Sequence, residues 1–283
     1  RAVARCAASA PAVDAEAKRA AVRERMRANT EFGVEGDCFE TLDEHRAWVN
    51  AWLAATAAVL GKGAYAAALA PDGARDAALS VVAAYVLADL GTAFYHWGVD
   101  NYGSGATPLV GTQIAGFQGH HRQPWVITLR DFENRVHAIC KPVVPCLCGL
   151  AAFGAPSATL HPFMATFGAM VVLSQQFHNW AHSKVADIPP PVRALQRAGL
   201  LLGRKAHGMH HCAPFENNYA IVSGMWNPLL DSSGIFPMLE RVVYDATGVR
   251  PRCWNEYGTD YVEDEPSGAE EQVREEDKIS VSA

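Results

Sequence analysis

The middle of the chain carries four long apolar stretches separated by polar segments. They cover residues 51–70, 77–95, 138–156 and 162–177; the first three each contain one charged residue, and the fourth contains none. A helix needs about 20 mostly apolar residues to cross a bilayer, whereas buried helices of soluble proteins are usually shorter and amphipathic. The pattern therefore predicts an all-α integral membrane protein with four transmembrane helices. A soluble helical bundle is the weaker alternative.

The segments around these stretches have a different character. Residues 192–203, "VRALQRAGLLLG", would place Arg on one side of a helix and Leu on the other, which predicts an interfacial helix. The first ten residues contain no acid, which suits the end of an organelle transit peptide over residues 1–13. An ordinary charged helix over residues 14–27 is the alternative for that end. We expect an N-terminal extension over 1–50, a membrane domain over 51–256 and an acidic, disordered tail over 257–283.

The charges support this arrangement. If all four stretches span, the N-terminus, residues 96–137 and everything after residue 178 share one side, which carries most of the Lys and Arg, while the short far links contain Arg75. This asymmetry is typical of a four-span protein. The net charge is −6 with the excess acid in the tail, so no basic surface for nucleic acid is expected. Seven cysteines without metal-finger spacing indicate a reducing compartment.

The same topology sorts the 11 histidines of the chain. His161 falls on the far side and is excluded from any shared site, and His45 is predicted to be an isolated surface residue. The remaining histidines fall on the positive side: His96, His120, His121, His137, His178, His182, His207, His210 and His211. Such a one-sided set of imidazoles indicates metal binding at one membrane face.

Spacing refines this prediction. His178 and His182 are four residues apart, as are His96 and Asp100, and residues 207, 210 and 211 would fan from one helical face. One zinc ion takes four ligands, so this larger set implies two metals. In "HNWAH", Asn179 stands where a zinc protease of the H-E-x-x-H type needs its Glu, which argues against that class. Haem held by two histidines would leave most of the set unused. Redox-active iron with positions open to O₂ fits better.

Five ordered motifs carry a family resemblance. They are "DLGTAFYHWGVDNYGS", "GHHRQPW", "SQQFHNWAHSK", "HGMHHCAPFENNYAIVSGMWN" and "GVRPRCW". Together with the segment "IPPPVRALQRAGLLL", they resemble the plasmanylethanolamine desaturase (Kua) and plant fatty acid desaturase 4 family, most closely its plastid branch. The resemblance runs from about residue 51 to residue 256.

The resemblance implies a membrane desaturase with two non-haem irons. Its metal ligands would be His96, Asp100, His120, His121, His178, His182, His207, His210 and His211. His137 matches a histidine of the plastid branch and would be a ninth histidine ligand or a group behind a ligand. Asp89 matches a family acid and lies seven residues before His96, on nearly the same helical face, so we expect it to orient a ligand imidazole. The alternative is a polar residue satisfied within the bundle.

The plastid branch also implies a substrate and partners. These are the palmitoyl chain of phosphatidylglycerol, desaturated at the Δ3 position with trans geometry, O₂ and two electrons from ferredoxin, in a chloroplast membrane. The rival readings are a lipid hydroxylase with the same iron site, a vinyl-ether-forming plasmanylethanolamine desaturase, and a non-catalytic metal- or haem-binding membrane protein.

Overall fold

A computed structural model describes residues 39–254, and every regular element in that range is a helix. The chain divides into two compact units, which are described one at a time. Within the described range, the first unit contains residues 39–86 and 125–187, and the second contains residues 87–124 and 188–254. The predicted transit remnant, the alternative helix over 14–27 and the acidic tail lie outside the described residues. The all-α prediction is confirmed.

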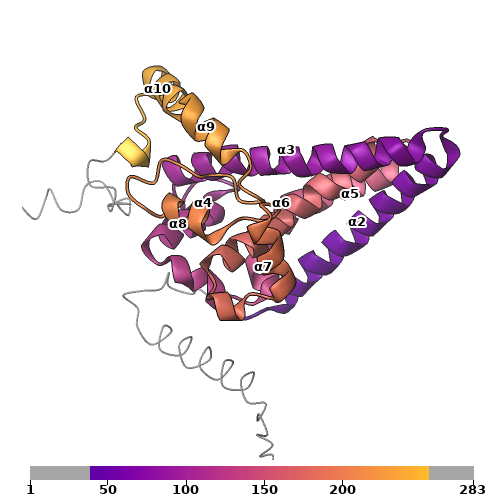
Figure 1. The fold of residues 1–283 in the computed structure, drawn as a ribbon, viewed down its shortest axis with the longest axis horizontal. Coiled ribbons are helices and arrows are strands. Elements are labelled where there is room, and N and C mark those ends of the chain that lie inside the picture. The colour runs from indigo at the N-terminus through magenta and orange to yellow at the C-terminus, as the bar shows by residue number, and fades with distance from the viewer. Residues whose placement is uncertain (1–38, 255–283) are drawn as a thin grey trace, which may run out of the picture. The chain divides into compact units, whose positions relative to one another are not determined.

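Three long helices form the core of the first unit: α2 (Asp43–Leu69), α5 (Phe132–Phe153) and α6 (Leu160–His182), which lie side by side in Figure 1. The buried residues of α2 recur every three or four positions, so this helix turns one stripe toward the other two. The shared core contains Val49, Trp52, Ala55, Val59, Val136, Ile139, Cys140, Val144, Leu147, Ala165 and Val172. At Gly63 a Cβ atom would come within 2.9 Å of Pro162, so glycine permits the close approach of α2 and α6.

The outward faces of the long helices are apolar as well. On α2, Leu53 and Leu69 are exposed, and on α3 (Gly73–Asn101), Leu79 and Val82 are exposed. Helices that are apolar on all sides suit a lipid environment. Accordingly, α2, α3 and α5 are long and apolar enough to cross a membrane. The fourth stretch lies in α6, which is not among those three within the described range, so the four-span count stays a prediction.

The helices of the first unit contain a lysine and two prolines within their apolar stretches. The Lys62 ammonium donates to the carbonyl oxygens of Ala151 (2.8 Å) and Gly154 (2.7 Å). It thereby provides hydrogen-bond donors for backbone carbonyls at the C-terminal end of α5. Helix α5 continues through Pro142 and Pro145, two residues that usually kink or interrupt a helix. The first unit also includes most of the short 3₁₀ helix η1 (Pro124–Leu129) and all of η2 (Val185–Asp187).

The second unit is built on the C-terminal part of α3. Around it come α4 (Gly111–Arg122), α7 (Pro190–Arg197), α8 (Arg204–His210), α9 (Asn227–Ser233), α10 (Ile235–Thr247) and the 3₁₀ helix η3 (Arg252–Trp254). One core cluster joins Ala93, Tyr219, Ala220, Leu230 and Phe236, and another joins Val99, Ile114 and Phe117. These clusters fix α3 against α4 and the segment after α8.

The predicted interfacial helix over 192–203 is shorter than expected. Helix α7 ends at Arg197, and the chain turns at Gly199, whose φ of +72° favours glycine. Leu202 is then fully buried, and its N–H donates to the carbonyl of Val222 at 2.9 Å. The last two leucines of the stretch, Leu201 and Leu202, therefore belong to the protein interior, whereas Leu200 is exposed.

Candidate metal centre

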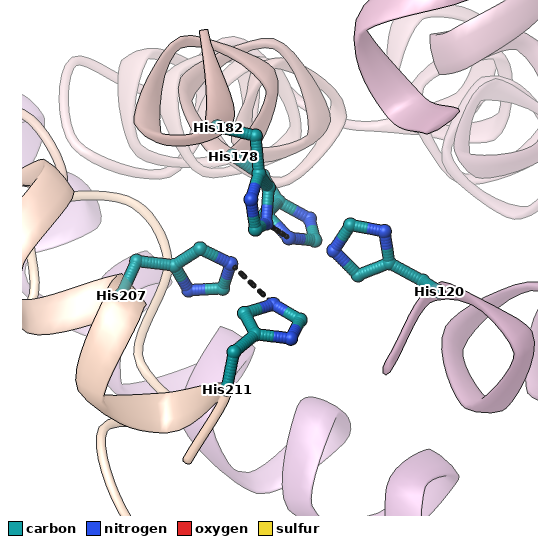
Figure 2. Close-up of side chains that lie close together, drawn as sticks. All are labelled: His120, His178, His182, His207 and His211. Atoms are coloured by element: carbon teal, nitrogen blue, oxygen red, sulfur yellow. Dashed lines mark hydrogen bonds between the residues drawn. The ribbon is translucent and has the colours of Figure 1, made fainter. Parts of the chain in front are cut away.

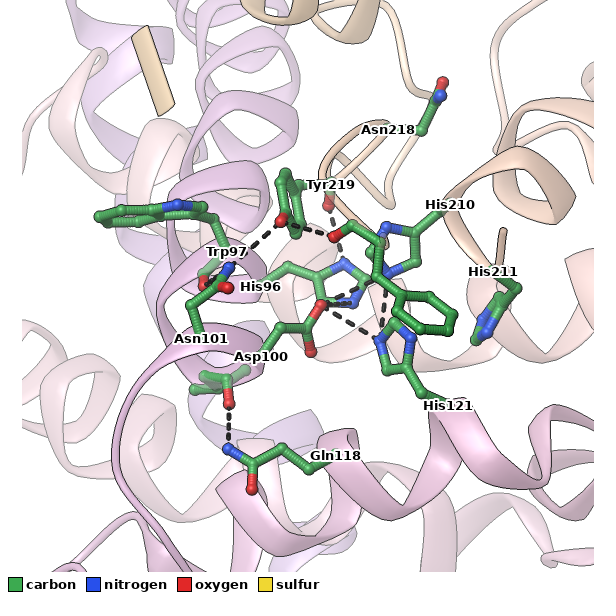
Figure 3. A network of polar contacts seen from close by, with 12 residues as sticks. His96, Trp97, Asp100, Asn101, Gln118, His121, His210, His211, Asn218 and Tyr219 are labelled. Atoms are coloured by element: carbon green, nitrogen blue, oxygen red, sulfur yellow. Dashed lines mark hydrogen bonds and ion pairs between the residues drawn. The ribbon is translucent and has the colours of Figure 1, made fainter. Parts of the chain in front are cut away.

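Four side chains of the second unit converge on one point, which we call the enclosed group: His96 and Asp100 from the end of α3, His121 from α4 and His210 from α8. All four are buried, and their ligand atoms lie within 4.8 Å of one another. The Nε2 atoms of His96 and His121 each lie 3.2 Å from Asp100 Oδ2, and that of His210 lies 3.4 Å away. Figure 3 shows the three rings directed at the carboxylate.

Backbone carbonyls fix the orientation of two of these rings. His96 Nδ1 lies 2.9 Å from the carbonyl oxygen of Tyr219, and His210 Nδ1 lies 2.7 Å from that of Asn217. A carbonyl oxygen only accepts hydrogen bonds, so each Nδ1 carries the proton and each Nε2 presents its lone pair to the centre. This is the arrangement in which histidine binds a metal.

The convergence of lone pairs fits a metal ion. His210 Nε2 lies 3.3 Å from His121 Nε2, and Asp100 Oδ1 is buried without a hydrogen-bond partner. A metal about 2.1 Å from each ligand atom would hold neighbouring ligand atoms about 3.0–3.4 Å apart. The observed spacings fall in this range. Burial also lowers the pKa of His121, against the opposing effect of Asp100, so this imidazole favours the neutral form that coordinates metals.

A second set of imidazoles in the same unit, the open group, consists of His120, His207 and His211. His207 Nε2 and His211 Nε2 are 3.1 Å apart, and the ring centroids of His120 and His211 are 4.8 Å apart. His207 is buried, whereas His120 and His211 are partly exposed. Because His121 belongs to the enclosed group and its ring centroid lies 4.7 Å from that of His211, the two groups adjoin.

Consecutive histidines therefore serve different groups. His120 and His121 at the end of α4 diverge, as do His210 and His211 at the end of α8. Residues 207, 210 and 211 fan from one side of α8, with ring centroids 4.8–5.5 Å apart. Within this fan, His210 turns toward Asp100, while His207 and His211 pair with each other.

In the first unit, His178 and His182 form a pair on the last turns of α6. Their Nε2 atoms are 3.1 Å apart, as their spacing of four residues predicts. Figure 2 draws this pair and the three rings of the open group, with a dashed line marking the contact within each.

The comparison with known proteins agrees with this geometry. The sequence model of the lipid desaturase domain matches residues 85–254, which include both groups and the α6 pair. The chain belongs to the lipid desaturase family.

Named relatives extend this result. The chain is 50% identical over 188 residues to fatty acid desaturase 4, chloroplastic, of Arabidopsis thaliana, a match covering 66% of this chain and 58% of the relative. It is 32% identical over 184 residues to plasmanylethanolamine desaturase 1 of Mus musculus (62% and 68% covered). It is 33% identical over 198 residues to a probable fatty acid desaturase of Acanthamoeba polyphaga mimivirus (68% and 94% covered). The chain thus spans less than two thirds of the Arabidopsis relative. No solved structure matches it.

Asp89 does not contact an imidazole of the enclosed group directly. It is fully buried, and its carboxylate accepts hydrogen bonds from the backbone N–H groups of Val222 (3.0 Å), Ser223 (2.7 Å), Gly224 (3.0 Å) and Trp226 (3.3 Å). The partners are thus backbone groups rather than a ligand imidazole. Through these N–H groups Asp89 is linked to the segment whose carbonyls contact His96 and His210.

The other expected histidines lie outside both groups. His137 stacks on His45 with ring centroids 3.9 Å apart, and its Nδ1 lies 2.7 Å from the carbonyl of Asn134. The expectation of an isolated surface His45 is wrong: it is buried, and its Nδ1 accepts from the N–H of Leu42, where α2 begins. His161 is buried at the start of α6 and belongs to neither group, in line with its exclusion.

Sequence reasoning missed the carbonyls of Asn217 and Tyr219. Both residues lie in the motif "ENNYAIVSGMWN", which follows the third histidine cluster and contains a single charged residue, Glu216. A polar and aromatic run directly after a histidine cluster is a reasonable place to search for groups that orient ligands.

Proposed function

We propose that this chain is a membrane acyl-lipid desaturase with two non-haem irons. In the overall reaction, two adjacent CH₂ groups lose one hydrogen each and become CH=CH. One O₂, two electrons and two protons are consumed, and two water molecules are released. The observation that carries the proposal is the convergence of three imidazole Nε2 atoms on Asp100, beside a second cluster of imidazoles.

The enclosed group would hold one iron through His96, Asp100, His121 and His210. The open group would contribute ligands to the other iron. The resemblance implies that His178 and His182 of α6 are iron ligands as well. Nitrogen and carboxylate ligands suit iron. His137 is left out of this set, since its ring stacks on His45. The irons, when bound, supply the O₂-dependent removal of hydrogen.

The protein's own residues hold this site rigid and dry. The ring of Phe117 lies edge-on to His96 at 5.1 Å between centroids, and that of Phe215 lies edge-on to His121 at 4.9 Å. Tyr219 covers His210 at 5.2 Å, and its hydroxyl donates to the carbonyl of Phe215 at 2.7 Å. These aromatic rings exclude water from the enclosed group, which limits side reactions of the reactive centre.

The position of the ligands on their helices bears on the substrate. His96 and Asp100 lie in the last two turns of α3, and His178 and His182 lie in the last turns of α6. A site at the end of a spanning helix would meet an acyl chain near its headgroup. We therefore propose the palmitoyl chain of phosphatidylglycerol, with a trans double bond at Δ3, in a chloroplast membrane and with ferredoxin as electron donor. The higher identity to the chloroplastic Arabidopsis relative supports this choice over the plasmanylethanolamine substrate.

The test is to express the chain with a plastid electron source and to analyse purified phosphatidylglycerol by gas chromatography. We expect a new Δ3-trans hexadecenoate, and none with Asp100→Asn at equal expression. The mouse relative supports a second candidate, a plasmanylethanolamine desaturase. An acid-labile vinyl-ether assay on the same cells distinguishes it: vinyl ether without hexadecenoate would move the chain to that activity. A hydroxylated lipid would instead indicate a hydroxylase.

A further inference from the structure

One segment orients two metal ligands that come from different helices. Residues 217–226, here called the orienting segment, provide the carbonyl of Tyr219 to His96 of α3 and the carbonyl of Asn217 to His210 of α8. Figure 3 shows the first of these contacts, between His96 and Tyr219. A shift of this segment would therefore turn both rings and change which ring nitrogen carries the proton. Whatever holds the segment in place also controls the enclosed group.

Asp89 is the main support of this segment. Its Oδ1 accepts three successive N–H groups, from Val222, Ser223 and Gly224, and its Oδ2 accepts a fourth, from Trp226. Successive N–H groups that point to one spot form a concave anion site, and Gly224 at φ +78° supplies the left-handed step. Because a carboxylate only accepts hydrogen bonds, it matches a cradle made of donors.

Neighbouring side chains extend the same support. Thr92, one turn further along α3, accepts the N–H of Ile221 at 3.2 Å. The Asn227 side chain makes two hydrogen bonds to the backbone of Ala220. Its Oδ1 accepts from the N–H at 2.8 Å, and its Nδ2 donates to the carbonyl oxygen at 3.2 Å. Helix α3 therefore carries both a ligand, His96, and the side chains that place the carbonyl to which this ligand donates.

We propose that Asp89 is a positioning residue for the enclosed iron. It fixes the orienting segment, and through the carbonyls of Tyr219 and Asn217 it sets the protonated nitrogen and the ring direction of His96 and His210. This inference rests on the proposed function, because it concerns the same iron site. Groups behind a metal ligand typically change metal affinity by about 10- to 100-fold, and we expect an effect of that size at the enclosed group only.

The test compares Asp89→Asn with Glu240→Gln in the purified full-length protein. Asparagine keeps the shape but brings an N–H₂ group into a cradle of donors. Glu240 is a matched control, since it is also a buried carboxylate of the second unit, with the indole N–H groups of Trp97 and Trp254 as partners. Iron is titrated at limiting concentration, and Mössbauer spectra resolve the two sites. In Asp89→Asn, we expect the enclosed site to bind iron about 10- to 100-fold more weakly, with the open site retained. In Glu240→Gln, both sites should be retained.

Each outcome separates this inference from the proposed function. Two normal iron sites in both the wild type and Asp89→Asn would overturn the positioning role and leave the function intact, as would equal loss from both sites. A wild type without two irons would overturn the function itself. If Asp89→Asn does not accumulate, Thr92→Val tests the same segment with the carboxylate in place. A smaller weakening at the enclosed site is expected there, and unchanged iron binding would overturn the inference.

Discussion

The enclosed and open groups adjoin within one unit, yet they are built differently. The enclosed group includes a carboxylate, is buried throughout, and has two rings fixed by backbone carbonyls. The open group consists of imidazoles, two of which are partly exposed. A buried anionic ligand compensates the charge of a metal ion, whereas neutral imidazoles near the surface leave more of that charge uncompensated. We therefore expect the enclosed group to hold its iron tightly and the open group to exchange its iron and admit reactants.

The largest loss of activity is expected when the anionic ligand of the enclosed group is removed. Asp100→Asn removes the negative charge on which His96, His121 and His210 converge. We expect desaturation to fall by more than about 100-fold, beyond what loss of a group behind a ligand would cause. Product formation by membranes of matched expression is the measurement. Asp245→Asn on the exposed face of α10 is the control, and equal loss in that variant would indicate a general charge effect.

Chelation tests the expected difference in iron binding. Brief treatment with a chelator of moderate strength should remove the iron of the open group first, because its rings are more exposed. Activity should then disappear while about half of the iron remains bound. The comparison is wrong if the site with the carboxylate ligand empties first, as judged by Mössbauer spectroscopy during chelation.

Histidines outside the two groups set the limits of the site. We expect His45→Ala and His161→Ala to retain activity within about 3-fold per folded molecule, since they reach neither group. Loss of the His45 ring also removes its stacking on His137, at a cost of about 1 kcal/mol in stability. Activity and thermal unfolding are measured in parallel. Loss of product from folded His161→Ala would contradict the topology that excludes this residue.

The smallest effect is a difference in thiol reactivity. Cys212 follows the open group and is exposed, whereas Cys253 is buried, and its N–H donates to Asn101 beside the enclosed group. Burial raises the pKa of the Cys253 thiol, with Glu240 adding to the effect, so it stays protonated at pH 8 while the thiolate is the reactive form. Maleimide labelling followed by peptide mapping should show that Cys212 is modified faster than Cys253. Preferential labelling of Cys253 would show that the enclosed side is open to solvent.

Much of the fold followed from hydrophobic patterning. Each of the four apolar stretches lies mostly within a helix, and all four helices extend beyond their stretch at one end or at both. Helix α2 begins at Asp43, eight residues before the apolar stretch. Hydrophobic patterning did not predict this start, because the first turn of the helix is polar. Helix α3 continues to Asn101, past the last apolar run, because His96 and Asp100 are buried by the second unit rather than by lipid. Local patterning cannot report such tertiary burial.

The candidate site was partly predictable. Pairs four residues apart, such as His178 and His182, do meet, since helix geometry alone brings them together. The sequence does not show that His120 and His121 belong to different groups. Adjacent side chains on a helix point in different directions, and only the fold determines which residues each of them meets. The carbonyl of Tyr219 carries no side-chain signature at all, so its role becomes evident only from its distance to His96.

The proposed reaction requires two irons, held by two different groups of ligands. Metal analysis of the purified protein, with absorption spectra, tests this most directly when wild type and His210→Ala are compared. We predict two non-haem irons per wild-type chain and about one in His210→Ala, which loses an enclosed ligand but leaves His207 and His211 in place. A haem Soret band, a single metal in the wild type, or an unchanged iron content in His210→Ala would contradict the account.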